Sequence, residues 1–409
     1  MKEKLGKYYN VISGYAFKSS DLKDSADIPI IKISNISNGR NVIFENMQYV
    51  DHEFLTIDEK YHIKNGDVLI SLTGSHINQP NSMVGRVCRN YDKQTYLLNQ
   101  RAGKIFGKEN ASTDYIFYAL LTKAMKESIV SRAYGAANQV NVSPSAIMSI
   151  KWDFPTLPTQ QKIASILSSY DRLIENNTRR IRLLEQMAEN LYKEWFVRFR
   201  FPEHENVEIV NGLPKGWEIK IIADFGRIET GKTPPMSNRD LYGGDILFVK
   251  TPDMHGKMFV RSTSETLSQE GNNYQRTKLL PINSIMVSCI GTAGIVSINT
   301  NLAHTNQQIN SIILNNLEDL EWLYYVCRQL KPTIELFGAT GATMTNLSKG
   351  KFEKLKIVVP KVDFRGAFHK RIRPYFKEIY ALEQQNTFLT RQRDLLLPRL
   401  MSGKLEVKS

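Results

Sequence analysis

The segment whose letters come nearest to a ligand-binding motif runs from Gly226 to Thr233. It reads Gly-Arg-Ile-Glu-Thr-Gly-Lys-Thr and fits G-x-x-x-x-G-K-[ST], the pattern of a loop that cradles nucleotide phosphates. Such a loop needs a strand before it and a helix that begins at the Lys-Thr pair. Residues 218–225 can form the strand, but Pro234 and Pro235 disfavour a helix start. We therefore expect a surface loop, in which Lys232 and Thr233 are available to contact phosphate groups.

No other residue pattern indicates catalysis or metal binding. Cys88, Cys289 and Cys327 lie far apart and form no CxxC pair, and the seven histidines form no H-E-x-x-H or H-x₃-H cluster. The sequence contains no G-x-S-x-G nucleophile motif and no nuclease-like cluster of carboxylates and lysine. We predict a chain without a catalytic site, a metal site or a bound cofactor. The low cysteine count fits a reducing compartment.

Composition and charge describe an ordinary globular protein with a basic balance. The 409 residues suggest about two to four domains, and 42% are hydrophobic and 23% charged. The N-terminus has no apolar signal-peptide core, and no run of about 18 apolar residues occurs, so we expect a soluble, cytoplasmic protein without a membrane partner. Of the net charge of +13, residues 156–200 carry +3 and residues 361–409 carry +6. A basic balance makes nucleic acid a plausible partner.

The sequence repeats itself in order, with an offset that drifts slowly from 218 to 205 residues. Insertions in loops would produce such a drift, whereas chance matches would not be collinear. The matched segments, first half then second, are 13–14 with 230–231, 27–32 with 245–250, 68–71 with 285–288, 99–100 with 306–307, 114–118 with 321–325 and Pro155 with Pro360. Each half shows short β-type runs, a helix near 112–132 or 318–336, a loop rich in small residues, and a long helix.

The two long helices give the strongest pattern. Apolar residues alternate by four and three along each, as in a heptad seam, and the seam positions of the second helix lie 205 residues after those of the first. The predicted seam residues are Ile163, Leu167, Tyr170, Ile174, Asn177, Ile181, Leu184 and Leu191 in the first helix, and Phe368, Ile372, Tyr375, Ile379, Leu382, Asn386, Leu389 and Leu396 in the second. A length of about 35–40 residues corresponds to roughly 55–60 Å. Pro374 should kink the second helix or mark a late start.

These patterns together predict an α+β fold, in which two duplicated mixed α/β domains are separated by two long helices. The expected boundaries are a first domain at 1–155, a first helix at 156–200, a second domain at 201–360 and a second helix at 361–409.

Motifs at the helix ends resemble the specificity subunit of type I restriction–modification systems. Residues 157–164, Leu-Pro-Thr-Gln-Gln-Lys-Ile-Ala, open the first helix, and residues 191–199, Leu-Tyr-Lys-Glu-Trp-Phe-Val-Arg-Phe, close it. Residues 395–405, Leu-Leu-Leu-Pro-Arg-Leu-Met-Ser-Gly-Lys-Leu, close the second helix, and 231–234 with 243–246 open the second domain. The resemblance spans essentially the whole chain. One departure is the second helix start, 361–366, which lacks the Leu-Pro-x-Gln-Gln motif and leaves the geometry of that junction open.

The resemblance implies a non-catalytic DNA-binding subunit of a DNA adenine methyltransferase and restriction complex. Each domain would be a target recognition domain that reads one half of a gapped bipartite site in double-stranded DNA. The two conserved spacer helices would form an antiparallel coiled coil, set the spacing and dock two methyltransferase subunits, with two restriction/translocase subunits in a complete restriction enzyme. S-adenosylmethionine, ATP and Mg²⁺ would then bind the partner subunits and not this chain.

Candidate base and phosphate contacts follow from residue type, because Arg suits guanine and Asn or Gln suits adenine. In the first half the candidates are Ser75, His76, Asn78, Gln79, Asn81, Asn138 and Gln139, and in the second half they are Lys232, Thr233, Arg239, His255, Lys257, Asn272, Asn273, Gln275 and Arg276.

Two other functions stay open at this point. A coiled-coil scaffold could join two protein-binding modules without DNA, in which case binding would be insensitive to salt, unlike phosphate-dominated binding. A P-loop NTPase would lose nucleotide binding when Lys232 is replaced by alanine, whereas a DNA-reading protein would lose only a little DNA affinity.

Overall fold

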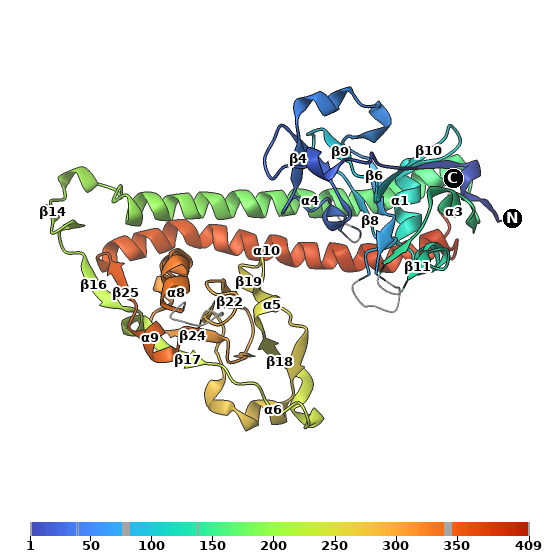
Figure 1. The fold of residues 1–409 in the computed structure, drawn as a ribbon. Helices are drawn as coiled ribbons and strands as arrows, with labels where there is room; N and C mark the ends of the chain where they lie inside the picture. The colour runs from blue at the N-terminus through green and yellow to red at the C-terminus, as the bar shows by residue number, and fades with distance from the viewer. Residues whose placement is uncertain are drawn as a thin grey trace. The chain divides into compact units, whose positions relative to one another are not determined.

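A computed structural model describes residues 2–37, 39, 41–75, 82–136, 139–338 and 346–407 of the chain. The chain divides into two compact units: unit 1 comprises Met1–Asn176 with Gln385–Ser409, and unit 2 comprises Asn177–Gln384. Each unit contains one globular domain together with about half of each of two long helices (Figure 1). The division at residues 155, 200 and 360 into four parts stays a prediction, because the compact units cut through the helices.

Among its described residues, the domain of unit 1 contains two main sheets and two small ones. The first main sheet has the order β2 (Tyr9–Ser13), β10 (Ala102–Gly107), β6 (Val68–Ser71), β8 (Val87–Arg89), and the second has the order β4 (Gln48–Val50), β3 (Ile28–Ile31), β9 (Tyr96–Leu98), β5 (His62–Ile63). The small sheets are β1 (Glu3–Lys4) with β13 (Lys151–Trp152), and β11 (Tyr134–Ala136), β12 (Gln139–Asn141), β7 (Thr73–Gly74). The shorter helices are α1 (Thr113–Leu121), α2 (Lys123–Val130) and α3 (Pro144–Met148).

The domain of unit 2 is built on the same plan. Its main sheets are β17 (Gly226–Thr230), β24 (Ile309–Leu314), β21 (Ile285–Ser288), β22 (Val296–Asn299), β19 (Phe259–Val260), and β20 (Glu265–Leu267), β18 (Tyr242–Val249), β23 (Ala303–Thr305). Two-stranded sheets pair β16 (Glu218–Ile221) with β25 (Lys356–Val359) and β14 (Ile209–Val210) with β15 (Leu213–Pro214). The shorter helices are α5 (Thr251–Met254), α6 (Gln269–Tyr274), α7 (Leu320–Gln329), α8 (Lys331–Gly338) and α9 (Lys349–Glu353).

The strand orders confirm the internal repeat. The order β2-β10-β6-β8 in unit 1 corresponds to β17-β24-β21-β22 in unit 2. The parallel pair β3–β9 in unit 1 corresponds to β18–β23 in unit 2, and the register is the same: Ile30 lies opposite Leu97, and Phe248 lies opposite His304. These paired residues lie at the offsets found for the matched sequence segments, so the two halves share one backbone frame.

One close backbone approach recurs in both halves. A Cβ atom added to Gly14 would lie 2.3 Å from the carbonyl oxygen of Leu98, and one added to Gly231 would lie 2.2 Å from the carbonyl oxygen of Thr305. Real Cβ atoms do not come this close to backbone oxygens, so only glycine fits at either position. The Ser13-Gly14 and Thr230-Gly231 match in the sequence therefore marks a point where two strands end against each other.

The predicted helix near 112–132 is divided into α1 and α2. Thr122 lies between them in an extended conformation, with ψ of 144°. Its hydroxyl accepts a hydrogen bond from the backbone N–H of Met125 and so caps α2. Because a threonine side chain satisfies a free helical N–H group, the chain can end one helix and begin the next without a loop.

The two long helices have the predicted lengths. Helix α4 (Leu157–Tyr192) has 36 residues and continues into a π-helical turn, η6 (Lys193–Val197), and α10 (Val362–Met401) has 40 residues. The expected late start at Pro374 is wrong, because α10 begins twelve residues earlier and runs through this proline. Buried Ile372, Phe376 and Ile379 hold that stretch against the core of unit 2, which offsets the lost hydrogen bond.

Within each unit, α4 and α10 contact each other. In unit 2, the ring centroid of Phe368, near the start of α10, lies 6.3 Å from that of Tyr192 at the end of α4. In the same unit Arg180 Nη2 donates to Glu378 Oε1 at 2.7 Å. In unit 1, Arg393 Nη1 donates to Asp171 Oδ1 at 2.7 Å. None of the sixteen predicted seam residues is exposed, and their assignment to one heptad seam stays a prediction.

The start of each long helix is fixed by an equivalent anchor. In unit 1, the buried Gln160 donates through Nε2 to the carbonyl of Pro155 and accepts through Oε1 from the N–H of Ser112. In unit 2, Arg365 donates to the carbonyl of Pro360 at 3.0 Å and to Asp319 Oδ1 at 2.6 Å. Pro360, Arg365 and Asp319 stand at the repeat positions of Pro155, Gln160 and Ser112. The junction that departs from the sequence motif thus keeps its geometry and replaces an amide with an ion pair.

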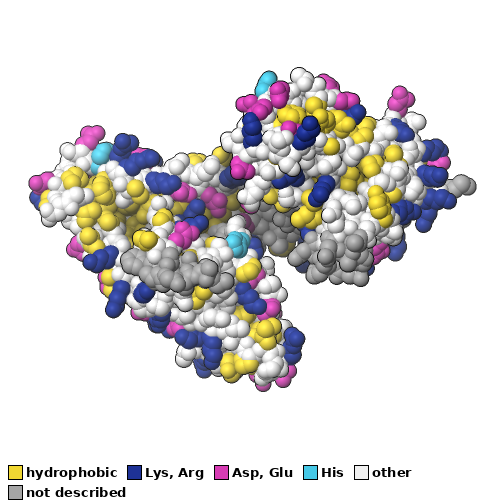
Figure 2. Space-filling view, in the orientation of Figure 1, with side chains coloured by type: hydrophobic (Ala, Val, Ile, Leu, Met, Phe, Trp, Pro, Cys, Tyr) yellow, Lys and Arg dark blue, Asp and Glu magenta, His cyan; other side chains and the backbone are white. Residues whose placement is uncertain are grey.

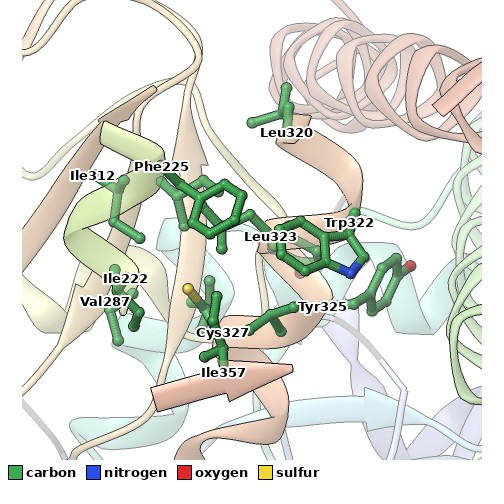
Figure 3. Close-up of a cluster of buried hydrophobic side chains, with 14 of the residues drawn as sticks. Ile222, Phe225, Val287, Ile312, Leu320, Trp322, Leu323, Tyr325, Cys327 and Ile357 are labelled. Atoms are coloured by element: carbon green, nitrogen blue, oxygen red, sulfur yellow. The ribbon is translucent and has the colours of Figure 1, made fainter. Parts of the chain in front are cut away.

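Each domain has its own hydrophobic core beneath the long helices. In unit 2 the core includes Phe225, Ile312, Trp322, Leu323 and Ile357 (Figure 3), and it extends to the apolar faces of both helices. In unit 1, Ile163 and Leu167 of α4 and Leu400 of α10 belong to the core that also holds α1 and α2. No helix among the described residues is long and apolar enough to cross a membrane.

Candidate nucleic-acid interface

The loop that follows β17 carries the strongest candidates of the second half. The loop begins where Gly231 packs against the backbone of Thr305. Lys232 donates its backbone N–H to the carbonyl of Thr305 at 2.9 Å. The Thr233 hydroxyl donates to Gln307 Oε1 at 2.7 Å. The next helical turn, η9, begins only at Arg239. Because no helix begins at Lys232 and its N–H is already bonded, the loop does not have the geometry of a nucleotide-binding P-loop.

The side chain of Lys232 instead meets an aromatic ring of α6. Its Nζ lies 4.8 Å from the ring centroid of Tyr274, and that ring is 48% exposed. Arg239, Asn273 and Arg276 are exposed as well, and in Figure 2 basic side chains lie at the end of unit 2 where Figure 1 places α6. An exposed set of cations, an amide and a ring provides the groups that bind phosphates and base edges. Tyr274 was not among the predicted contacts, although its aromatic type beside Asn273 was a usable signal.

A buried carboxylate ties this surface together. Glu229 of β17 is 6% exposed and accepts hydrogen bonds from Arg227 Nη1, at 2.9 Å, and from Lys278 Nζ. A carboxylate in such a place requires partners of opposite charge. The pairing attaches η10 (Arg276–Lys278) to β17, the strand that leads into the Lys232 loop. We call Lys232, Arg239, Asn273, Tyr274 and Arg276 the α6 surface.

Helix α6 itself is fixed against η9 (Arg239–Leu241). A Cβ on Gly271 would lie 2.1 Å from the carbonyl oxygen of Leu241, so the two segments are in backbone contact. Ser268 caps the helix by accepting from the N–H of Gly271, and its hydroxyl donates to the carbonyl of Asp240. These contacts hold Arg239 and the residues of α6 next to each other in a fixed arrangement.

Two of the predicted base contacts lie inside the domain. Asn272 is 8% exposed and Gln275 is 4% exposed. Asn272 Oδ1 accepts from His304 Nε2 at 2.9 Å, and burial lowers the pKa of His304 to about 4, so the ring is neutral near pH 7. Both residues were predicted as base contacts because their amides suit adenine. Neighbouring positions of a short helix point to different sides, however, and these two side chains point into the domain. In this structure neither amide reaches the surface that a base edge could touch.

Two further candidates lie apart from this group. His255 and Lys257 are exposed and follow α5. Lys257 lines a hollow together with Glu185, Tyr324 and Arg328, next to the long helices and not beside α6. Lys232, Arg239 and the α6 residues are not among those that line this hollow, although the sequence placed Lys257 and Lys232 between strands of one domain.

In the first half, the structure brings two predicted segments together. Gln139 is exposed on β12, and β12 pairs with β7, which ends one residue before Ser75. The carbonyl of the half-buried Ser75 accepts from the hydroxyl of Ser82 at 2.6 Å. His76, Asn78, Gln79, Asn81 and Asn138 lie outside the described residues.

The first half also contains a cation–ring contact that the sequence analysis did not predict. Lys60 Nζ lies 4.9 Å from the ring centroid of Tyr61. That ring packs edge-on against Tyr15, with centroids 5.6 Å apart, and Tyr15 packs against Phe17. Tyr15 follows Gly14 as Lys232 follows Gly231, so this aromatic group lies beside the repeat position of the Lys232 loop. Among the described residues, no three His, Cys, Asp or Glu side chains cluster to hold a metal ion.

Comparison with known proteins gives the family of this chain. The family model of the type I restriction modification DNA specificity domain matches residues 2–186 and 214–387. The specificity subunit of the type I restriction enzyme HindI from Haemophilus influenzae is 33% identical over an alignment of 356 residues that covers 71% of this chain and 77% of that protein. The MjaIX specificity subunit from Methanocaldococcus jannaschii is 26% identical over 409 residues and covers 97% of this chain and 91% of its own.

A solved structure agrees at the level of the fold. The type I restriction-modification S subunit from M. genitalium superposes with a TM-score of 0.62 at 14% identity, covering 100% of this chain and 96% of that one. The family match covers most of the chain and occurs twice, once in each half. This protein therefore belongs to the family of type I restriction–modification specificity subunits.

Proposed function

We propose that this chain is the non-catalytic DNA sequence-specificity subunit of a type I restriction–modification enzyme, and that each domain reads one half of a gapped bipartite target. The observation that carries the proposal is one backbone frame built twice, with different side chains at the positions after Gly14 and Gly231. A shared frame with divergent loops suits two readers of different short sequences.

We further propose that α4 and α10 form an antiparallel coiled coil that sets the distance between the half-sites. Supporting contacts are the Arg180–Glu378 and Asp171–Arg393 ion pairs, both at 2.7 Å, in the two units. A straight helix of 36 residues is about 54 Å long, and recognition elements on one face of B-DNA repeat every 34–36 Å or so. A helical spacer of this length can hold two readers more than one DNA turn apart.

The outer faces of the helices are proposed to dock two methyltransferase subunits, with two restriction/translocase subunits added in a complete restriction enzyme. Ile166 and Leu173 of α4 are 37% and 48% exposed and lie seven residues apart, and Phe388 and Leu395 of α10, 54% and 59% exposed, have the same spacing. Apolar side chains repeated on one exposed helix face favour a protein contact. S-adenosylmethionine, ATP and Mg²⁺ would bind those partners.

A random-pool selection on double-stranded DNA tests the function. The tagged full-length chain, purified from its native host with the subunits that remain attached, should enrich two short defined blocks separated by a constant unspecified gap. An intact complex that enriches no such motif would contradict DNA reading and favour a protein scaffold. The affinity for the enriched site should also fall steeply with salt.

Replacement of Lys232 by alanine should weaken binding to the enriched site and reduce the slope of log affinity against log salt by about 1, because one phosphate contact is lost. Tyr274→Leu should weaken binding a few-fold without changing that slope, since the ring holds the ammonium group at an exposed site. Fluorescence anisotropy at several salt concentrations measures both effects.

The matched control is Lys354→Ala, which removes the same charge from an exposed position outside the α6 surface. Equal slopes for the Lys232 and Lys354 variants would remove Lys232 from the DNA interface and leave only a general effect of net charge.

A further inference from the structure

Unit 2 contains an open cavity of about 370 Å³ that the DNA-reading function does not use. It lies between α10, the start of α7 and the loops beside β19 and β22. Its apolar lining consists of Phe259, Ile282, Leu317, Leu320, Phe376 and Tyr380. Ile282 and Leu317 are 51% and 53% exposed, so the apolar lining continues to the rim. Large exposed apolar side chains around a hollow are typical of a binding site.

Two cations stand one helical turn apart along the α10 side of this cavity. Arg373 and Lys377 are both exposed and both line it. Among the residues that the structure describes, neither forms a salt bridge with a carboxylate. Cations that line a largely apolar cavity without a carboxylate partner can bind an anionic group brought by a ligand.

A buried pair that also lines the cavity fixes the first of these cations. Glu321 and His369 are 3% and 7% exposed, and His369 Nδ1 donates to Glu321 Oε2 at 2.6 Å. With its proton on Nδ1, the ring accepts at Nε2 from Arg373 Nη1 at 3.0 Å. The carboxylate thus orients the imidazole, and the imidazole orients the guanidinium. A guanidinium held in place loses less conformational entropy when it binds a carboxylate.

Three of the α10 residues that line this cavity have no counterpart of the same type in the first half. At the positions 205 residues earlier, Ala164 stands for His369, Ser168 for Arg373 and Asp171 for Phe376. Asp171 is engaged by Arg393 and accepts from the hydroxyl of Tyr118. At these three positions the first half therefore carries no imidazole, no guanidinium and no aromatic ring.

We propose that this cavity receives an apolar side chain of a partner protein, from a segment in which carboxylates lie within a turn of that side chain. The apolar lining selects the inserted side chain, and Arg373 and Lys377 select its acidic neighbours. A DNA phosphate would leave the apolar walls exposed to water, so the observations favour a protein segment. The inference rests on the proposed function only in that the chain works within a multi-subunit complex. It predicts one occupied site per chain, unlike docking on the repeated helix faces.

Site-specific photo-crosslinking tests this proposal on the full chain, purified as its complex from the native host. A benzophenone amino acid at the rim position Leu317 should yield a crosslinked partner peptide that contains an apolar residue flanked by Asp or Glu. The same probe at Leu302, 46% exposed and not part of the cavity lining, should not yield that peptide. Arg373→Glu with Lys377→Glu should reduce the yield at least tenfold, and Arg373→Lys with Lys377→Arg should keep it.

Lys377→Glu alone provides a variant that leaves the buried Glu321–His369 pair untouched, and it should still reduce the yield several-fold. A peptide without acidic residues, or a yield unaffected by charge reversal, would overturn the proposal. So would a charge reversal that lowers DNA affinity by the same factor as the crosslink, because the cations would then contact phosphate. Loss of gapped DNA selection with an intact crosslink would instead contradict the proposed function and leave this site standing.

Discussion

Arg365→Ala is expected to lower the free energy of unfolding by about 3–5 kcal/mol, because it leaves the carboxylate of Asp319 buried without its partner. The side chains of Arg365 and Asp319 are 13% and 9% exposed, and their atoms approach to 2.6 Å. The guanidinium also lies 5.4 Å from the ring centroid of Phe225 and 5.5 Å from that of Trp322. Urea unfolding followed by tryptophan fluorescence measures the loss, since Trp195, Trp217 and Trp322 all belong to unit 2.

Arg180→Ala is the matched control, because its ion pair with Glu378 has side chains that are 52% and 45% exposed. An exposed pair of this kind contributes about 0–1 kcal/mol. The double variant Arg365→Ala with Asp319→Ala should recover part of the stability, since no unpaired charge is left. Similar losses for Arg365→Ala and Arg180→Ala would show that the junction is not held by this ion pair.

Gly231→Ala is expected to abolish reading of one half-site while the other half-site is still selected. The new Cβ would lie 2.2 Å from the carbonyl oxygen of Thr305 and 2.3 Å from that of Asn306. Backbone atoms cannot move aside by changing rotamer, so the cost should reach or exceed the upper end of the roughly 1–3 kcal/mol typical of overpacking. The Lys232 loop would be displaced, and a random-pool selection should return one defined block instead of two.

Gly14→Ala should remove the opposite block, because the equivalent Cβ would lie 2.3 Å from the carbonyl oxygen of Leu98. Gly350→Ala serves as the control, since no atom lies within 4 Å of its added Cβ and its backbone is helical. Both blocks should persist in that variant. If Gly231→Ala and Gly14→Ala lost the same block, the assignment of one reader to each domain would be wrong.

Sequence patterns were sufficient where the information is local or repeated. The seam spacing from Ile163 and from Phe368 gave two helices of nearly the observed lengths, because a buried helix face has a fixed period. The collinear matches gave the duplication, and the Gly14 and Gly231 pair within them marks the same close approach in both halves. The family followed from motifs at the helix ends, one of which contains the buried anchor Gln160.

The site was predicted only in part, because residue type does not encode burial. Lys232, Arg239, Asn273 and Arg276 are exposed, as a recognition surface requires. Asn272 and Gln275 belong to the same short segment as Asn273 and Arg276, but their side chains are buried inside the domain. The partner of Lys232 lies 42 residues away in the sequence, and only the packing of α6 against η9 brings Tyr274 to it.

The sequence by itself determined the repeat, the two long helices, the family and the absence of a P-loop helix after Lys232, because periodicity, order and proline chemistry act along the chain. Only the tertiary structure showed that Arg365 takes the place of Gln160 at the second junction. An amide and an ion pair can anchor a helix start in the same way, but their residue types differ, so the sequence does not reveal the equivalence. The tertiary structure also decided that His369, Arg373 and Lys377 line one cavity together with apolar side chains of α7 and the neighbouring loops. This cavity depends on which side chains of α7 and of the domain loops pack opposite α10. Contacts between segments far apart in the chain follow no fixed sequence spacing, so the sequence alone does not predict them.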